Sequence, residues 1–378
     1  MAYVSFFTVT FRDAAVNRAA VPFFSATSYA RFVNTPTAAQ NPEYEMLPPN
    51  LENAVYGLLV TPALHLADKH GMLAELLAHS PLTGGQVAAR IAADPDTVER
   101  LLLVLTSAGL LHRDDAGAFA VDPVAAPYLD SKNPSYVGGF VKHMVDALAQ
   151  LPRLEQYVGR GKEAVDAGLP TPYERFYTDD LSTEEFMGAM WSLSYGISQE
   201  IAELADLGES SLLIDVGGAN GPFAIAALER NPALRAIVFD LPPVQPHLER
   251  MRDKYGMTDR LSFTGGDFFT DELPRGDVVA FGYVMSNWPD PECGALLRKA
   301  FHACRPGGRA LILDRLFEDD RSGPLSTAVM NLTMQVETHG VHRTAAEFET
   351  LLTAAGFTAC TVHRTSRDKH LIIGHKRA

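Results

Sequence analysis

A short apolar run that ends in paired glycines is the part of the sequence best suited to binding chemistry. The run, Leu212–Val216, predicts a strand buried on both faces of a sheet. It stops at Gly217 and Gly218, and the residues from Pro222 onward have helical periodicity. A strand, a glycine turn and a helix start together make a pocket in which backbone approaches a ligand without side-chain obstruction. We therefore expect a ligand site at this turn.

Two carboxylates belong to the same expected site. A second apolar run ends in Asp240, where a carboxylate can hold ribose hydroxyls. Asp215 lies just before the glycines, where it would repel a pyrophosphate but could face a cationic group. The spacing of Gly217, Gly218 and Gly221 also differs from the G-x-G-x-x-G of dinucleotide folds. The motif instead resembles the S-adenosylmethionine motif of class I methyltransferases, with a glycine turn in some other α/β protein as the alternative.

Length, charge and cysteine content limit the class of protein. At 378 residues the chain should form two domains or one large one. No apolar run is long enough for a membrane span, and nothing predicts a signal peptide. The formal net charge of −14 argues against nucleic acid and anionic membranes as partners. Cys293, Cys304 and Cys360 lack C-x-x-C spacing, which argues against disulfides or zinc and favours a reducing cytoplasm.

Residues 1–46 differ in composition from the rest of the chain. Aromatic residues interleaved with Ser and Thr precede a linker-like stretch, and Met46 precedes the first convincing domain. We consider three interpretations of this segment: a loose arm, a translation start placed too early, or an arm that packs on a partner subunit.

Residues 47–135 predict a winged helix. Helical periodicity begins at Leu47, Thr83 and Asp94 are candidate helix N-caps, and two strands around an Asp-Ala-Gly turn end at Val121. Winged helices often bind DNA, but the segment that would enter the groove carries more carboxylates than arginines. We therefore disfavour DNA binding.

Residues 136–200 predict a helical linker that is rich in aromatic and Met side chains. Such stripes usually pack in a core, but this segment joins two domains, and pockets prefer domain interfaces. We expect part of it to line a substrate cavity. The candidates are Phe176, Met187, Met190 and Trp191.

Strands and helices alternate through residues 201–378. This order predicts a doubly wound, largely parallel α/β sheet that binds ligands at the carboxyl ends of its strands. One strand is expected to run from Leu261 to Phe269. Acidic residues fall at the ends of four expected strands, where such a site would collect them: Asp215, Asp240, Asp267 and Asp314.

From about Leu47 to its C-terminus the chain resembles the small-molecule O-methyltransferases that dimerise through an N-terminal winged helix. These include plant caffeate-type enzymes and bacterial polyketide- and anthracycline-tailoring enzymes. The motifs that carry the resemblance, in this order, are Asp215-Val-Gly-Gly-x-x-Gly221, Asp240-Leu-Pro, Gly266-Asp-Phe-Phe269, Asn287-Trp-Pro-Asp290, Pro306-Gly-Gly308, and Arg343-Thr344 with Glu347-Phe348. The resemblance implies a class I S-adenosylmethionine-dependent methyltransferase, a Rossmann-like seven-stranded sheet and a homodimer.

The resemblance also implies a cofactor site, residue by residue. Gly217 and Gly218 would approach the methionine part, Asp240 would hold the ribose, and Asp267 and Phe268 would meet the adenine. The remaining members of the implied cofactor set are Asp215, Leu241 and Gly282, the last near the carboxylate end of the methionine.

Catalysis is where the sequence departs from this family. Relatives commonly place a histidine, as general base, where this chain has Ser286, and an unassisted serine cannot act as that base. A glutamate that often orients the base is His342 here, whereas the acid at Asp314 is kept. Some anthracycline-modifying relatives also lack the histidine.

Two hypotheses follow. Either His342 or His339 acts as the base, which the titration range of histidine permits, or positioning alone suffices for an acceptor that ionises easily. Asn287 is a candidate substrate ligand, and we disfavour a metal site formed by the two histidines with Asp314. Further candidates for the substrate cavity are Ser286, Trp288 and Met334.

We expect O-methylation of a phenolic, aromatic or polyketide-type small molecule. The alternatives are N- or C-methylation, and use of the cofactor for hydroxylation, decarboxylation or a pericyclic step. A non-catalytic winged-helix binding protein is a third possibility, against which the intact glycine turn argues.

Overall fold

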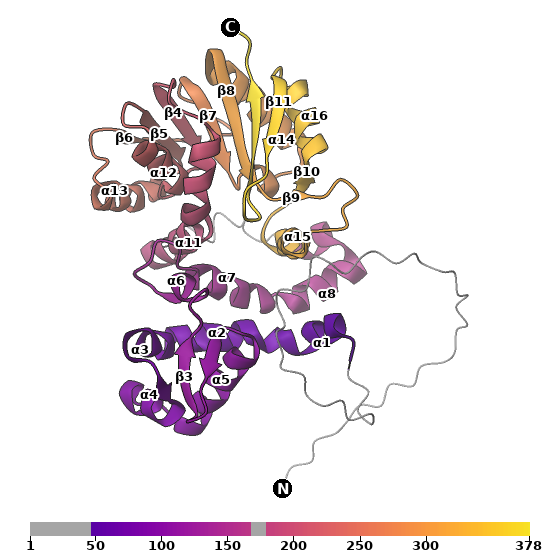
Figure 1. Ribbon diagram of the computed structural model, residues 1–378. Coiled ribbons are helices and arrows are strands. Elements are labelled where there is room, and N and C mark those ends of the chain that lie inside the picture. Colours follow the sequence, from indigo (N-terminus) through magenta and orange to yellow (C-terminus); the bar gives the residue numbers. More distant parts are fainter. Residues whose placement is uncertain (1–46, 168–178) are drawn as a thin grey trace. The chain divides into compact units, whose positions relative to one another are not determined.

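The structure, a computed structural model, describes residues 47–167 and 179–378 (Figure 1). Contacts divide the chain into two compact units, Met1–Glu52 and Asn53–Ala378. The described part of the first unit contains the start of helix α1 (Pro49–Tyr56). The expected arm over residues 1–46 and the candidate Phe176 lie outside the described residues.

The second unit begins with a small helical domain that carries a three-stranded antiparallel sheet. Its strands pair in the order β1 (Leu82–Thr83), β3 (Ala118–Val121), β2 (Leu111–Arg113), and its helices are η1 (Gly57–Leu59), α2 (Val60–Lys69), α3 (Met72–His79), α4 (Gly84–Ile91) and α5 (Pro95–Ser107). Thr83 accepts a hydrogen bond from the Gln86 N–H, and Asp94 accepts one from the Thr97 N–H, so both expected N-caps are present. These elements match the helices and the hairpin expected in this region.

A helical segment connects this domain to the large sheet. Its helices are α6 (Ala126–Leu129), α7 (Gly138–Leu148), α8 (Leu151–Arg160), α9 (Lys162–Asp166) and α11 (Asp180–Leu204). Helix α11 is 25 residues long and begins where the Asp179 side chain accepts a hydrogen bond from the Ser182 N–H. Because it packs against both α7 and α12 (Pro222–Arg230), α11 has apolar residues on more than one face.

A seven-stranded sheet forms the rest of the unit, in the order β11-β12-β8-β7-β4-β5-β6. The strands are β4 (Leu212–Val216), β5 (Arg235–Asp240), β6 (Leu261–Gly265), β7 (Gly276–Gly282), β8 (Cys304–Asp314), β11 (Thr358–His363) and β12 (His370–His375). Neighbours from β8 to β6 are parallel, whereas β12 is antiparallel to both β8 and β11. The predicted Rossmann-like α/β fold is confirmed.

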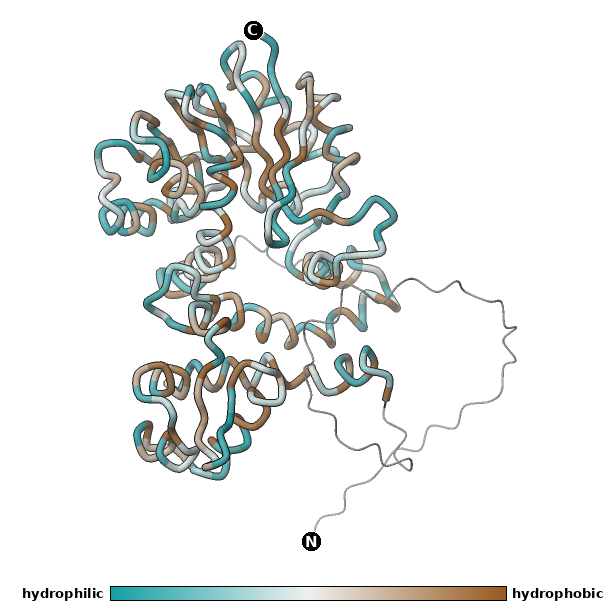
Figure 2. The backbone as a smooth tube through the Cα atoms, in the orientation of Figure 1, coloured by the Kyte–Doolittle hydropathy of each residue, from teal (hydrophilic) through white to brown (hydrophobic). Residues whose placement is uncertain are grey.

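Both faces of this sheet are covered by helices (Figure 1). One face packs on α11, α12 and α13 (Gln245–Lys254), and the other packs on α14 (Asp290–Ala303) and α16 (Ala345–Ala354). Alternate strand residues serve the two faces, so Leu213 packs in the first core and Ile214 in the second. Figure 2 shows hydrophobic residues concentrated along these strands, as expected for a sheet buried on both faces. The remaining elements are η2 (Pro242–Val244), η3 (Met285–Asn287), α15 (Leu325–Glu337) and the parallel pair β9 (Leu316–Phe317) and β10 (Arg343–Thr344).

Strand β6 is shorter than the sequence predicted, because it ends at Gly265 and not at Phe269. The Asp267 side chain accepts a hydrogen bond from the Phe269 N–H at 2.8 Å, which folds the chain into a turn. A Cβ at Gly266 would lie 2.5 Å from the Phe239 ring, so the turn packs closely on β5. Asp267 and Phe268 therefore lie in a loop beyond the strand end.

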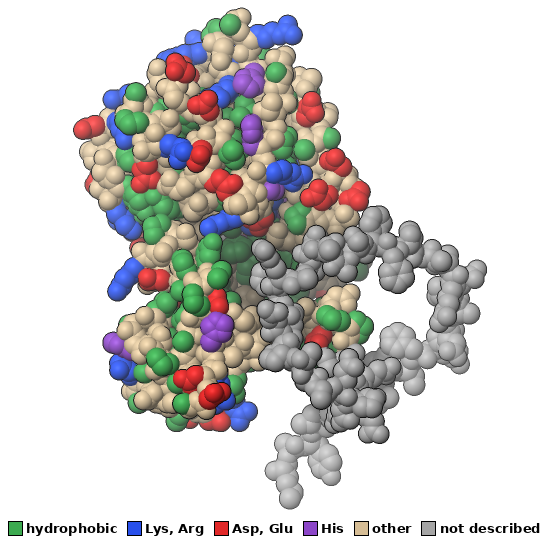
Figure 3. Space-filling model, viewed as in Figure 1, with side chains coloured by type: hydrophobic (Ala, Val, Ile, Leu, Met, Phe, Trp, Pro, Cys, Tyr) green, Lys and Arg blue, Asp and Glu red, His purple; other side chains and the backbone are tan. Residues whose placement is uncertain are grey.

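The surface shows no membrane-spanning feature among the described residues, none of whose helices is long and apolar enough to cross a bilayer. On the face seen in Figure 3, acidic and basic side chains are interspersed over the region of the seven-stranded sheet.

Candidate active site

Left-handed backbone forms the turn between β4 and α12. Gly217 and Gly221 have φ angles of 65° and 83°, and Ala219 between them has a φ angle of 51°. Glycine adopts this conformation without steric cost, whereas a larger residue is strained in it. A Cβ at Gly217 would lie 2.7 Å from Cγ2 of Val284, so the turn is packed against the segment that follows β7.

Asp215 and Asp240 lie at the ends of neighbouring strands beside this turn. The Asp240 carboxylate accepts hydrogen bonds from the N–H groups of Ala219 and Leu241, each at 2.8 Å. The Asp215 carboxylate accepts one from the Ala224 N–H at 3.2 Å. Burial raises the pKa of Asp240 to about 6 and the pKa of Asp215 to about 7. Two such carboxyl groups favour a ligand that donates hydrogen bonds or carries positive charge.

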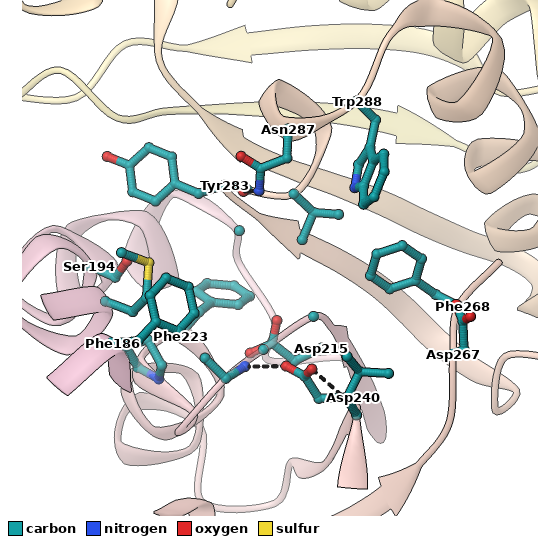
Figure 4. Close-up of a pocket in the computed structure, with 18 of the residues that line it drawn as sticks. Phe186, Ser194, Asp215, Phe223, Asp240, Asp267, Phe268, Tyr283, Asn287 and Trp288 are labelled. Carbon is teal, nitrogen blue, oxygen red and sulfur yellow. Dashed lines mark hydrogen bonds between the residues drawn. The ribbon is translucent and has the colours of Figure 1, made fainter. Parts of the chain in front are cut away.

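A cavity of about 220 Å³ lies over these strand ends, and we call it the first cavity. Every residue expected to bind the cofactor lines it: Asp215, Gly217, Gly218, Asp240, Leu241, Asp267, Phe268 and Gly282. Figure 4 shows Asp240, Phe268 and Trp288 around this cavity, with Phe186 and Ser194 reaching it from α11. Because the strand order is β7-β4-β5-β6, these groups are spread along the cavity from Gly282 to Phe268.

The Phe268 end of the cavity is held by a lysine outside it. The Lys299 Nζ donates hydrogen bonds to the carbonyl oxygens of Phe268, Phe269 and Asp271 at 2.8, 3.0 and 2.6 Å. The Phe268 ring packs edge-on against Phe269 and Trp288, with ring centroids 4.7 and 6.2 Å away. These contacts fix an aromatic wall at this end of the cavity.

A second cavity of about 70 Å³ adjoins the first. The two share Phe186, Met190, Tyr283 and Asn287 in their linings. The other residues that line the second cavity are His143, Leu193, Ser286, Arg315, Met330, Met334, Glu337, Thr338 and His342. The two cavities together offer space for one ligand beside another.

His342 and Asp314 form a buried pair at the second cavity. The Nδ1 atom of His342 lies 3.4 Å from Oδ1 of Asp314, and the two side chains are only 2% and 1% exposed. The other Asp314 oxygen accepts a hydrogen bond from the Ser286 N–H at 3.1 Å, and the Asn331 side chain accepts one from the His342 N–H at 2.8 Å. Neither ring nitrogen of His342 makes a hydrogen bond within the described part of the chain. The imidazole is thus available to a ligand.

The loop that carries Ser286 and Asn287 is anchored by Arg343. The buried Arg343 guanidinium donates to the carbonyl oxygens of Met285 and Trp288, each at 2.9 Å. A Cβ at Gly340 would overlap the backbone of Ser286 and Asn287, so the two loops are in direct backbone contact. The Arg343-Thr344 motif, although far from β7 in sequence, therefore packs on the loop that follows β7.

The remaining sequence candidates divide according to the face of the helix or loop on which they lie. Met190 lines both cavities, Trp288 lines the first, and Ser286 and Met334 line the second. Met187 and Trp191 line neither. The Met187 side chain is buried, and its backbone carbonyl accepts a hydrogen bond from Asn220. Trp191 packs against the core and stacks on Tyr195 with ring centroids 4.4 Å apart. His339 is exposed and also lines neither cavity.

Comparison with known proteins identifies the family to which the chain belongs. The O-methyltransferase domain family matches residues 154–358, and the O-methyltransferase dimerisation domain matches residues 54–131. The chain belongs to the O-methyltransferase family. The tetracenomycin polyketide synthesis 8-O-methyl transferase of Streptomyces glaucescens is 33% identical over 305 residues, which cover 80% of this chain and 89% of that relative.

Two further relatives agree with this family. The 3-hydroxy-5-methyl-1-naphthoate 3-O-methyltransferase of Streptomyces sahachiroi is 31% identical over 327 residues, 86% of this chain and 93% of that relative. The crystal structure of human N-acetylserotonin methyltransferase in complex with S-adenosylmethionine superimposes with a TM-score of 0.79 and 26% identity, over 90% of this chain and 100% of that chain. The resemblance stated from the sequence is confirmed, and S-adenosylmethionine is the cofactor.

The first cavity of this O-methyltransferase fits that cofactor. Each Asp240 oxygen accepts one N–H and keeps lone pairs for ribose hydroxyls. The Phe268 ring offers a flat apolar wall of the kind that a planar base requires, and the turn at Gly217 presents backbone without a side chain to the cavity. Asp215 adds a second carboxyl group to the lining, which suits a ligand that carries positive charge. Charge, shape and hydrogen-bonding capacity therefore agree.

Several residues that line the two cavities had not been singled out from the sequence, among them Lys369, Tyr283 and His143. Lys369 and Tyr283 line the first cavity, and His143 lines the second, where its Nε2 lies 3.2 Å from Oε1 of Glu337. None of these residues is part of a motif with readable spacing. Tyr283 is marked by a φ angle of 56°, which is strained for a large side chain and can be seen in the structure but not in the sequence.

The described residues contain no group of three or more His, Cys, Asp or Glu side chains that could hold a metal ion.

Proposed function

We propose that this O-methyltransferase transfers the methyl group of S-adenosylmethionine to a phenolic oxygen of an aromatic, polyketide-type natural-product intermediate. The observation that carries the proposal is the His342–Asp314 pair, which lies in a cavity directly beside the one that fits the cofactor. Met190, Met330 and Phe186 give the second cavity apolar walls suited to an aromatic ring. The names of two bacterial relatives, which act in tetracenomycin synthesis and on a hydroxynaphthoate, support the same acceptor class.

The cofactor-binding roles follow from position along the cavity. In this proposal Asp240, with Leu241 beside it, holds the ribose, and Asp267 and Phe268 hold the adenine. The methionine portion lies against Gly217, Gly218 and Gly282, and its positive charge faces Asp215. Their common lining of one cavity supports this assignment.

His342 is proposed as the general base, in place of the histidine that the family resemblance leads us to expect at Ser286. A neutral imidazole can accept the phenol proton at Nε2 while Nδ1–H points to Asp314, which stabilises the imidazolium that forms. The 3.4 Å separation is long for a hydrogen bond, and catalytic hydrogen bonds often tighten when the acceptor binds. His339 is not favoured for this role, because it is exposed and outside both cavities.

The bound cofactor supplies an electrophilic methyl group on a sulfonium. The chain's own contribution is to ionise the acceptor at His342, to orient it with Asn287 and Ser286, and to exclude water from the two cavities. Asn287 lines both cavities, and its side-chain amide donates a hydrogen bond to the Tyr283 carbonyl at 2.7 Å. In this proposal the side-chain oxygen of Asn287 accepts a hydrogen bond from the hydroxyl group of the methyl acceptor.

We further propose a cytoplasmic homodimer that associates through residues 47–135. Residues 136–200 would form the cavity-lining linker and residues 201–378 the catalytic domain. The match of residues 54–131 to a dimerisation domain supports the homodimer, and three unpaired cysteines support a reducing compartment.

The test is incubation with S-adenosylmethionine and a panel of phenols, hydroxynaphthoates and hydroxyquinones, read by mass spectrometry. The expected result is a methyl ether formed in equal amount to S-adenosylhomocysteine. Methylation at nitrogen or carbon, or a cofactor-dependent product without a gained methyl group, would contradict the proposed acceptor. A folded protein that binds the cofactor but modifies no member of the panel would also count against it.

A further inference from the structure

Lys369 is a buried cation in the first cavity for which neither the sequence motifs nor the proposed mechanism provides a role. It immediately precedes β12, lines the cavity and is only 1% exposed. Strand β12 is antiparallel to β8, with His370 opposite Asp314, so the chain enters β12 at the carboxyl edge of the parallel strands. This topology delivers the lysine to the ligand-binding edge of the sheet from a distant part of the sequence.

The surroundings of Lys369 leave its charge poorly compensated. Its Nζ lies 3.4 Å from the Ser194 hydroxyl and 4.1 Å from the centroid of the Tyr283 ring. It makes no ion pair with any described carboxylate, although Asp215 and Asp314 are near enough to act on it electrostatically. Burial lowers the pKa of the ammonium group to about 8, with those two carboxylates opposing the shift. A buried ammonium without a close anion favours an anionic ligand.

The position of Nζ identifies which part of the cofactor it would meet. A Cβ at Gly282 would lie 3.6 Å from Nζ, so the ammonium occupies the space beside the end of β7 that glycine leaves open. With adenine at the Phe268 loop after β6 and ribose at Asp240 on β5, the methionine portion must extend over β4 toward β7. This portion ends in an α-carboxylate, the one anionic group of S-adenosylmethionine.

We propose that Lys369 binds the α-carboxylate of the methionine portion of S-adenosylmethionine and so fixes the cofactor's depth in the cavity. The inference rests on the proposed cofactor-binding arrangement, in which the adenine lies at Phe268. The lysine ammonium has three N–H donors. Its contacts with the Ser194 hydroxyl and the Tyr283 ring hold it at this end of the cavity.

An alternative role is to stabilise an ionised acceptor oxygen. Lys369 lines the first cavity and not the second, and it borders Gly282 and Ser194 at the methionine end. The geometry therefore favours the cofactor carboxylate over the acceptor.

The experiment uses two ligands that differ only in this carboxylate. S-Adenosylhomocysteine and its decarboxylated amine, 5′-deoxy-5′-(3-aminopropylthio)adenosine, are titrated calorimetrically into the full-length wild type and into Lys369→Met. The wild type is expected to prefer S-adenosylhomocysteine by roughly 10- to 100-fold, the range for a hydrogen bond to a charged group. Lys369→Met is expected to bind the two ligands within about twofold of each other, because its loss falls on S-adenosylhomocysteine alone.

Lys299→Met is the matched control. Lys299 holds the Phe268 loop through backbone carbonyls, so its loss should weaken both ligands by the same factor. Equal weakening of both ligands in Lys369→Met, or an unchanged preference, would overturn the inference. If Lys369→Met does not fold, the affinities of the wild type for the two ligands are the test, and equal affinities would overturn the inference. A wild type that binds neither ligand would overturn the proposed cofactor site, and this inference with it.

Discussion

The His342 imidazole reaches Asp314 across two segments that are adjacent only in the fold, with Nδ1 3.4 Å from Oδ1. Asp314 ends β8, whereas His342 directly precedes β10, which pairs with β9 beyond that strand. The Asp314 carboxylate also accepts the N–H of Ser286, the residue at which the family resemblance leads us to expect a histidine. One carboxylate thus links the expected position of the base to the histidine proposed to replace it.

If His342 is the base, His342→Asn should lower kcat by about 100- to 10,000-fold, the usual contribution of general base catalysis. The loss should be smaller for hydroxyquinones, whose hydroxyl groups ionise more readily than those of simple phenols. Affinity for S-adenosylhomocysteine should not change, because His342 lies outside the first cavity. Steady-state kinetics over a series of acceptors, with His339→Asn as the exposed control, checks this prediction. Near-normal turnover by His342→Asn would instead favour catalysis by positioning alone.

Cofactor binding should release protons between pH 6 and 7. In the free protein burial raises the pKa of Asp240 to about 6 and that of Asp215 to about 7. Ribose hydroxyls and a positive charge stabilise the ionised carboxylates, so binding lowers both pKa values and protons leave. Affinity should therefore rise as pH increases from 5 to 7.5. Calorimetry in two buffers of different ionisation enthalpy measures the released protons, and net proton uptake at pH 6.5 would show that these carboxyl groups do not face the cofactor as proposed.

The sheet, the glycine turn and the carboxylates at the strand ends could be predicted from the sequence because their signals are local, whereas Leu241, Phe268 and Gly282 were expected from the family resemblance. Strands buried on both faces are continuous apolar runs, as at Leu212–Val216, and parallel strands bring the residues at their carboxyl ends to one edge. The end of β6 was the exception, since the turn at Asp267 depends on a side-chain hydrogen bond and on close packing of Gly266 against Phe239.

Groups that tertiary packing brings to the site gave no such signal. Lys369 arrives through an antiparallel strand added beside β8, and His143 arrives from a helix that precedes the sheet. The sequence also did not show which face of α11 lines the cavity, because the helix is apolar on several sides. Trp191 packs against the core on the α12 side of the sheet, Met187 is buried outside the cavity, and Phe186, Met190 and Ser194 line the cavity. The sequence alone does not contain that choice.

Arg343 should contribute more to the free energy of unfolding than Asp290, the exposed carboxylate that lies 2.7 Å from its guanidinium. Arg343→Met removes the charge-assisted hydrogen bonds to the buried carbonyls of Met285 and Trp288, and a hydrogen bond to a charged group contributes about 1.5–3 kcal/mol. The expected loss in the free energy of unfolding is about 3 kcal/mol or more. Asp290→Asn, which affects a side chain that is 69% exposed, should cost about 1 kcal/mol or less. Urea unfolding of the two variants tests this order, and equal losses would contradict it.

Gly340 should be required for the geometry of the acceptor site as well as for packing. A Cβ at this position would overlap the carbonyl oxygen of Ser286 and the backbone of Asn287, so Gly340→Ala must displace the loop that carries both residues. We expect a loss of about 1–3 kcal/mol in the free energy of unfolding, together with a lower kcat, because overpacking moves the acceptor-binding side chains. Gly159→Ala in α8, where a Cβ would meet no atom within 4 Å, should leave kcat unchanged and stabilise the helix by up to about 1 kcal/mol. Chemical unfolding and steady-state kinetics on both variants check the contrast. A Gly340→Ala enzyme that keeps full turnover would show that the backbone contact between the two loops does not set the position of Ser286 and Asn287.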